Sequence, residues 1–216
     1  MSDRHTRLSD TGDLPVLSDS EIADREASNG LLQYDRVQEL IRAAIDSGTF
    51  RLRTSTLLDL NRVAVDGLEP NAGNFRSVDV EIDGSQHDPP SWRDVPRLVD
   101  DLCDYVNAAW SESSALHLAA YTMWRINWIH PFTNGNGRTS RAVSYLVLCS
   151  RLEQELPGRT AIPEMIARNK TPYYEALDQA DEAWAREQVD VTAMEELLRG
   201  YLAAQLLDVI NQASGG

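Results

Sequence analysis

The stretch His130–Arg141, HPFTNGNGRTSR, separates two apolar segments near the middle of the chain. The segment before it, 114–129, is apolar on nearly all sides and predicts a buried central helix. Pro131 cannot extend that helix, and the Gly-Asn-Gly turn opens a second apolar helix over 140–152. The sequence therefore predicts a central pair of buried helices joined by this short loop.

Helical periodicity extends outward from this pair over most of the chain. The other predicted helices occupy 21–28, 34–48, 54–67, 95–110, 172–185 and 191–210. One segment departs from the pattern, because Val78, Val80 and Ile82 alternate with acidic residues and Asp83-Gly84 is a hairpin turn signal. We expect an all-α domain with one short β-hairpin, which is either packed decoration or an edge that docks a peptide.

The boundaries of the domain follow from composition. Residues 1–19 are polar and lack sustained periodicity, which predicts a flexible N-terminal arm. A single domain is expected over 20–210, followed by a flexible tail over 211–216, because a chain of 216 residues can bury one substantial core. Cys103 and Cys149 lie in apolar helical stretches, where free cysteine behaves as a small hydrophobe.

Charge and hydropathy exclude several classes of function. The formal net charge of −14 disfavours non-specific binding to nucleic acid or to an anionic membrane. No apolar run is long and charge-free enough to span a bilayer, and the N-terminus lacks the apolar core of a signal peptide. We therefore expect a cytoplasmic protein that uses neither nucleic acid nor membrane as a partner.

The loop over 130–141 combines several features. Each is common in proteins, but together they are specific for an anion site. Backbone N–H groups gather at the start of the second helix, where the helix dipole is positive, and this arrangement favours an anion. Gly135 and Gly137 allow a phosphate to approach the backbone, while Arg138 and Arg141 supply guanidinium groups from the first turn. A polyphosphate chain fits such a site better than a lone carboxylate.

His130 is the only group in this stretch that titrates near neutral pH. It is placed to accept the proton of a hydroxyl that attacks a phosphorus held by the turn. Phe132 is expected to turn inward and anchor the loop. These residues together predict phosphoryl or nucleotidyl transfer, in which positioning and charge stabilisation supply most of the catalysis.

The stretch resembles the core motif of the Fic domain, His-x-Phe-x-(Asp/Glu)-Gly-Asn-Gly-Arg-x-x-Arg, at seven of its eight defined positions. The segments GNFR at 73–76, the hairpin and PYYEALDQAD at 172–181 follow in the order expected for that family. The resemblance covers roughly 21–207 and implies a Fic-like helical bundle. It also implies that the hairpin is a target-docking flap, represented by Val78, Val80, Ile82 and Gly84.

Fic proteins are mostly adenylyltransferases that move AMP from ATP to a Ser, Thr or Tyr hydroxyl of a target protein, with Mg²⁺. The resemblance implies that His130 is the general base and Phe132 the anchor. The expected nucleotide-binding residues are Gly135, Asn136 and Gly137 at the α- and β-phosphates, Arg138 and Arg141 at the β/γ end, and Tyr174 and Asp181 further along the nucleotide. Glycine at 137, where the Doc-type kinases carry lysine, favours transfer of AMP over transfer of phosphate.

Two positions depart from the family pattern. Asn134 stands where the family carries its acidic metal ligand, and Mg²⁺ prefers anionic oxygens, so weaker metal binding and slower turnover are expected. Asp181 stands where the family often has an asparagine against adenine. Two alternatives accordingly stay open: a catalytically weak nucleotide-binding module, and transfer of a different nucleotide such as UMP or GMP.

The resemblance also raises the question of self-inhibition, because many Fic proteins pair a glutamate with the second motif arginine. Glu26 is the favoured candidate, and Glu196 is the alternative. The inhibition could equally come from a separate partner protein. An inhibitory glutamate would further imply that the chain can remove AMP from a modified target.

Overall fold

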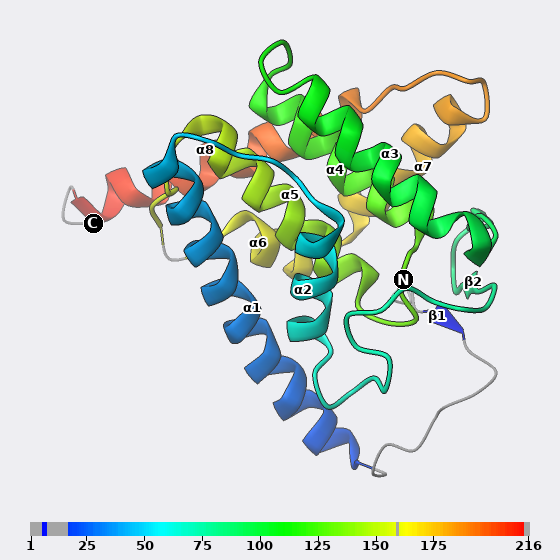
Figure 1. Ribbon diagram of the computed structural model, residues 1–216. Helices are drawn as coiled ribbons and strands as arrows, with labels where there is room; N and C mark the ends of the chain where they lie inside the picture. The colour runs from blue at the N-terminus through cyan, green and yellow to red at the C-terminus, as the bar shows by residue number, and fades with distance from the viewer. Residues whose placement is uncertain (1–5, 8–16, 159, 214–216) are drawn as a thin grey trace.

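The computed structural model describes residues 6–7, 17–158 and 160–213, in which helices predominate (Figure 1). The helices are α1 (Asp19–Ser47), α2 (Thr54–Ala64), α3 (Val95–Ala108), α4 (Ala115–Ile129), α5 (Asn136–Leu152), α6 (Ile162–Arg168), α7 (Thr171–Trp184) and α8 (Thr192–Ala213). A 3₁₀ turn, η1 (Trp92–Asp94), and two short strands, β1 (Thr6–Arg7) and β2 (Glu81–Ile82), complete the described elements. The predicted all-α class is confirmed.

The centre of the fold is the predicted pair of buried helices, α4 and α5, which make the most extensive helix–helix contact in the described chain. Almost every side chain of α4 from Leu118 to Ile126 is buried, as its nearly continuous apolar sequence predicts. Ser114 caps the start of α4 by accepting a hydrogen bond from the backbone N–H of His117 at 3.0 Å. The pair therefore forms a rigid support for the loop that joins its two members.

The remaining helices cover this pair from two sides (Figure 1). α1 and α2 pack on α5 and on each other, whereas α3, α7 and α8 pack on α4. α1 is one continuous helix where the sequence suggested two, and it begins with a capping box in which Ser18 and Glu21 bond reciprocally. α6 was not expected from the sequence, since its seven residues are too few to show periodicity.

The flap differs from the predicted hairpin. The turn is present, with Gly84 at φ +71°, but Val78 and Val80 lie outside any strand. Only Glu81–Ile82 is extended, and its strand partner among the described residues is Thr6–Arg7, with Thr6 opposite Ile82. Residues 85–91, which were expected to form the return strand, are not in a strand.

Hydrogen bonds to other parts of the chain hold the flap instead. Arg76 Nη1 donates to Val78 O at 2.9 Å, and Trp92 N donates to the Asp79 carboxylate at 2.8 Å. His87 Nε2 lies 2.8 Å from Trp128 O on α4. The flap is therefore fastened to the helical body along its length.

The domain boundaries can be compared only where the chain is described. α1 begins at Asp19, at the end of the predicted arm, and α8 continues to Ala213, inside the predicted tail. The flexibility of the arm and the tail stays a prediction, and residues 1–5, 8–16 and 214–216 lie outside the described part. Within that part, none of the helices has the length and apolar character needed to cross a membrane.

Candidate active site

The site begins where α4 ends. His130 caps this helix in the left-handed conformation, with φ 51° and ψ 58°, and its N–H donates to Ile126 O at 2.9 Å. Pro131 explains the ending, because a proline disfavours the helical conformation of the residue before it. A non-glycine residue in this region is strained and persists only when its surroundings hold it there.

Arg76 provides much of that hold. Its side chain is buried, its Nε donates to His130 O at 2.8 Å, and its backbone N–H donates to Pro131 O at 2.9 Å. Nη2 adds bonds to Ile129 O and to Pro90 O. A guanidinium at the C-terminus of α4 also complements the negative end of the helix dipole. Sequence reasoning used the GNFR segment only as a landmark and assigned Arg76 no role.

Burial controls the protonation of His130. Desolvation lowers the pKa of its imidazole to about 3, the hydrogen bond to Asn127 O opposes that shift, and the positive charge of Arg76 adds to it. Its Nδ1 lies 3.4 Å from Asn127 O, and a proton on Nδ1 would leave Nε2 as an acceptor. The ring is therefore neutral at pH 7 and can accept a proton.

Phe132 and Asn136 lock the loop that follows. Phe132 is fully buried beside Phe75, with ring centroids 5.9 Å apart, which is the position expected of the anchor. Phe132 N donates to Asn136 Oδ1 at 2.9 Å, and Asn136 Nδ2 donates to Phe132 O at 2.7 Å. The side chain of Asn136 is thus occupied within the loop, and its backbone N–H is the group available to a phosphate.

Asn61 on α2 fastens the same loop from the other side, and sequence reasoning missed it. Its Nδ2 donates to Asn134 O at 2.9 Å and to Thr139 Oγ1 at 3.2 Å, while its Oδ1 accepts from Gly73 N at 3.1 Å. One buried amide therefore joins α2, the motif loop and the segment before the flap. Nothing in the local sequence around Asn61 signals this role.

The two glycines of the turn are required for different reasons. Gly135 is the N-cap of α5 with φ +78°, and a Cβ there would lie 2.6 Å from Val65 Cγ1. Gly137 has no unusual φ, but a Cβ there would lie 3.1 Å from Arg141 Nη1. Gly135 therefore shapes the turn, whereas Gly137 leaves room for a guanidinium. The first N–H groups of α5 have no partner within the helix and point out of its start.

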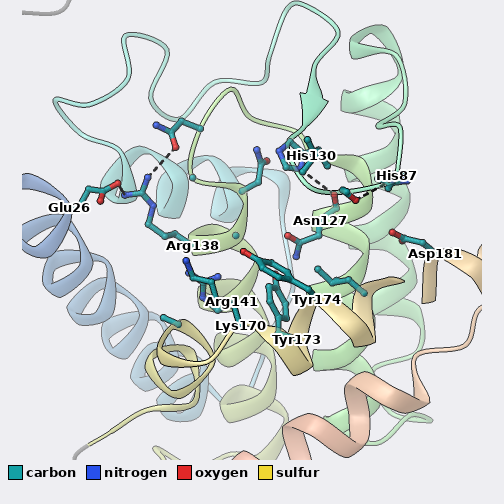
Figure 2. Close-up of a pocket in the computed structure, with 18 residues that line it drawn as sticks. Glu26, His87, Asn127, His130, Arg138, Arg141, Lys170, Tyr173, Tyr174 and Asp181 are labelled. Atoms are coloured by element: carbon teal, nitrogen blue, oxygen red, sulfur yellow. Dashed lines mark hydrogen bonds and ion pairs between the residues drawn. The ribbon is translucent and has the colours of Figure 1, made fainter. Parts of the chain in front are cut away.

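Arg138 is held by three acceptors. Its Nη1 donates to Ala64 O at 3.1 Å, its Nη2 donates to Asn134 Oδ1 at 3.2 Å, and Nη1 lies 3.3 Å from Glu26 Oε1 (Figure 2). Burial lowers the pKa of the guanidinium, and Glu26 opposes that shift. The expected inhibitory pairing was with the second motif arginine, Arg141, but Glu26 pairs with the first.

These contacts also decide how well the cavity fits Mg²⁺. The only motif oxygen at the position of the family's metal ligand is the amide oxygen of Asn134, which already accepts from Arg138. The described residues contain no group of three or more His, Cys, Asp or Glu side chains that could hold a metal ion. The donor set does not fit a magnesium ion held by a carboxylate of the chain.

His130, the glycine-rich turn, the two motif arginines and Glu26 border one cavity of about 460 Å³ (Figure 2). Cationic groups and the start of α5 form one end, and α7 forms the other. The predicted residues that line it are Glu26, Ile82, His130, Asn134, Gly135, Asn136, Gly137, Arg138, Arg141, Tyr174 and Asp181. Sequence positions far apart, on α1, the flap, α5 and α7, are thus brought to one place.

The α7 end of the cavity combines aromatic rings with a carboxylate. Asp181 Oδ1 accepts from Trp124 Nε1 at 2.8 Å, which fixes the acid against α4. Tyr173 is buried beneath the Arg141 guanidinium, which lies 6.0 Å from the centre of its ring.

Sequence reasoning missed His87, Asn127 and Lys170, which also line the cavity. Of these three residues, only Lys170 carried a signal in the sequence, because it is the only lysine of the chain.

Several predicted positions lie outside the cavity lining. Val78 is exposed, Val80 is buried, and Gly84 forms the turn beyond Ile82. Glu196 is exposed on α8 and does not line the cavity, so of the two inhibitory candidates only Glu26 lies at a motif arginine.

Comparisons with known proteins agree with this geometry. Residues 51–148 match the family model described as "Fic/DOC family". The chain is 26% identical over 184 residues to the protein adenylyltransferase Fic of Nematostella vectensis, which covers 82% of the chain and 40% of that protein. It is 30% identical over 160 residues to the same-named protein of Drosophila persimilis, covering 71% of the chain and 29% of that protein. The chain belongs to the Fic/DOC family and spans less than half the length of these relatives.

Solved structures share the fold. A Fic domain-containing signaling protein from Bacteroides thetaiotaomicron superposes with a TM-score of 0.71 at 21% identity, covering 93% of this chain and 77% of that one. Fic-1 from C. elegans (residues 134–508) gives a TM-score of 0.69 at 18% identity, covering 94% and 55%. At these identities the likeness establishes the Fic fold.

The two glycines generate a first prediction. Gly135→Ala should lower the free energy of unfolding by roughly 1–3 kcal/mol, because alanine is strained at positive φ and its Cβ meets Val65. Gly137→Ala should leave stability almost unchanged and weaken triphosphate binding, because its Cβ presses on Arg141. Urea denaturation and calorimetric titration with a triphosphate measure the two effects. Equal losses of stability in both variants would contradict this division.

The burial of His130 generates a second prediction, which concerns how the free energy of unfolding depends on pH. The unfolded chain binds a proton here below about pH 6.5, whereas burial keeps the native imidazole neutral down to a pKa of about 3. The contribution of His130 to the free energy of unfolding is therefore retained above pH 6.5. Below that pH the free energy of unfolding falls by up to about 1.4 kcal/mol per pH unit, because only the unfolded chain takes up the proton. His130→Gln should flatten the pH dependence of the unfolding free energy below pH 6.5 relative to the parent. Parallel curves for parent and variant would show that burial does not perturb this imidazole.

Proposed function

We propose that this chain carries the active site of a protein adenylyltransferase, which moves AMP from ATP to a Ser, Thr or Tyr hydroxyl of a target protein. The observation that carries the proposal is the meeting, in one cavity, of a neutral buried imidazole with a glycine-rich helix start and two arginines. The curated relatives are named protein adenylyltransferases. The cytoplasmic location of the protein stays a prediction from the sequence.

In the proposed reaction, the phosphates of ATP lie against the N–H groups at the start of α5, between Arg138 and Arg141. The target hydroxyl attacks the α-phosphorus and gives its proton to His130. The new O–P bond forms as the bond to the β-phosphate breaks, and pyrophosphate leaves. The arginines and N–H groups stabilise the charge that moves onto the departing phosphates.

The low pKa of His130 has a consequence for this step. A base with a pKa of about 3 is weak, but an anionic triphosphate beside it favours the protonated imidazole. The substrate therefore strengthens the base that acts on it. A target hydroxyl that arrives without nucleotide meets an imidazole with little tendency to accept its proton.

The base of the nucleotide is proposed to lie at the α7 end, near Tyr174, Leu177 and Asp181. A carboxylate accepts hydrogen bonds and does not donate them, so Asp181 favours a base that presents an amino group, as adenine does. Guanine presents donors as well. Competition of UTP, GTP and CTP against labelled ATP decides between these bases.

Transfer of label is the direct test of the activity. The parent chain, incubated with lysate and ATP labelled in the adenosine moiety, should attach label to protein bands that mass spectrometry can identify. His130→Ala should lose at least about 100-fold of that labelling, because general base catalysis contributes roughly 10² to 10⁴ in rate. Equal nucleotide binding with no labelling by either protein would favour the alternative, a weak nucleotide-binding module.

Self-inhibition by Glu26 is the second part of the proposal. Glu26 holds Arg138 at 3.3 Å, and a carboxylate on that guanidinium competes with the phosphates it would bind. The same engaged glutamate would suit the reverse reaction, removal of AMP from a modified protein.

Glu26→Gln should therefore raise labelling several-fold and lower the KM for ATP. Glu196→Gln is the matched control, since it removes the same charge from an exposed position outside the cavity. Equal activity in all three proteins would show that Glu26 does not inhibit the chain.

Magnesium is proposed to enter with the phosphates of ATP, because the chain supplies only the amide of Asn134. Asn134→Asp should lower the Mg²⁺ concentration needed for half-maximal labelling by about tenfold, since it restores a hard anionic oxygen. Asn134→Ala, which removes the amide that accepts from Arg138, is the control for a change in the arginine alone. An unchanged Mg²⁺ requirement in Asn134→Asp would show that this position does not contact the metal.

A further inference from the structure

A buried arginine on α4 lies outside the cavity lining and lacks the partners that a buried charge normally has. Arg125 is only 6% exposed, and its Nε and Nη1 have no hydrogen-bond partner in the described part of the chain. Burial lowers the pKa of its guanidinium, and the opposing charge of Asp101 on α3 does not cancel that shift. Packing alone does not account for this residue, because an apolar side chain of the same length would avoid the cost of burying a charge.

Three tryptophan rings surround the guanidinium. Arg125 Cζ lies 5.4 Å from the ring centre of Trp124 and 4.2 Å from that of Trp128, both on α4. It lies 4.6 Å from the ring centre of Trp184, at the end of α7. Ring faces attract a cation, most strongly where water is excluded. The arginine therefore holds these three rings, which we call the tryptophan cluster, and through them joins the end of α7 to α4.

One member of the cluster reaches the cavity. Trp124 is fully buried, and its Nε1 donates to Asp181 Oδ1 at 2.8 Å. Asp181 lines the α7 end of the cavity (Figure 2). Trp184 follows Asp181 by three residues on α7, so the two side chains are neighbours on the helix surface. The cluster thus holds the turn of α7 that carries the carboxylate.

The hydrogen bond between Trp124 and Asp181 has only one polarity. An indole N–H is a donor only, and an ionised carboxylate is an acceptor only. Trp124 therefore fixes the direction of the carboxylate without taking up any hydrogen-bond donor of the base. The exocyclic amino group of adenine can donate to a carboxylate fixed in this way, and a base without that group cannot.

We propose that Arg125 is a positioning residue for recognition of the base: it holds the ring of Trp124, and Trp124 holds Asp181 in the direction that accepts the amino group of adenine. This inference rests on the proposed function, which places the base at the α7 end of the cavity. Asp181 contacts the base, and the other two residues act through it. The unpaired cation is retained for selectivity between nucleotides, at a cost in stability.

The experiment compares ATP with purine riboside 5′-triphosphate, which lacks only the 6-amino group. Calorimetric titration of the full chain gives the ratio of the two dissociation constants, and this ratio reports recognition of the amino group. The parent should bind ATP about tenfold more tightly, as a hydrogen bond to a charged acceptor provides. Trp124→Phe keeps a ring and removes the N–H donor, and it should bring the ratio close to one. Arg125→Met keeps the length of the side chain and should lower the ratio several-fold.

Two further measurements separate positioning from a structural role. The double variant should lower the ratio no further than Trp124→Phe does alone, because Arg125 acts through Trp124. Arg125→Met should keep or raise the urea midpoint of unfolding, since it removes an unpaired buried charge. In the labelling reaction it should raise the KM for ATP and leave kcat within about twofold of the parent, because binding of the base is the same in ground and transition states.

Arg93→Met is the matched control. Arg93 also lies over a tryptophan ring, with its Cζ 4.6 Å from the ring centre of Trp92, but it is exposed and outside the cavity lining. This variant should behave as the parent does.

Four results decide the matter. Equal weakening of both nucleotides in Arg125→Met, with a lower urea midpoint, would show a structural role and overturn the inference, as would a further loss in the double variant. A parent that binds both nucleotides equally and still transfers AMP would overturn the inference and leave the proposed function standing. The expected ratios in every variant without any transfer of label would overturn the proposed transfer alone. Absence of both nucleotide binding and label would overturn both.

Discussion

The site depends on the abrupt end of α4 at His130. A histidine in a left-handed conformation, followed by proline, turns the chain away from one buried helix and toward the start of the next. The guanidinium of Arg76 makes this turn tolerable, because it bonds the carbonyls that α4 leaves without helical partners. That one buried arginine thereby joins the end of α4, which carries the imidazole, to the flap.

The distribution of charge around the cavity explains the self-inhibition that we propose for this chain. Arg138 is partly neutralised by Glu26 and also bonded to the amide of Asn134, so phosphates must compete for it. A carboxylate at 134 would add a second negative charge at Arg138, beside that of Glu26. Under the proposed function, the neutral amide leaves this guanidinium more available to phosphate and offers a poorer ligand to a metal ion.

Prediction from sequence succeeded where the signal was local. The apolar run before His130, the proline and the glycine pair are contiguous, so they define the α4–α5 pair and the turn between its members without knowledge of distant residues. The motif also located Glu26, Tyr174 and Asp181 through the family's order of segments, and all three line the cavity. The hairpin was predicted from alternation and a turn signal, and neither could reveal that β2 pairs with Thr6–Arg7 and not with the residues after the turn.

What the sequence determined by itself is the class of chemistry: an imidazole, a glycine-rich turn and two arginines at fixed spacing, on a helix whose start they define. Only the tertiary structure decided how that chemistry is held and restrained. Arg76, Asn61, His87 and the β1–β2 pairing act through partners tens of residues away, and no local pattern encodes such a contact. The physical reason is that backbone carbonyls and strand edges bond any donor that packing brings near, so their partners depend on the fold as a whole.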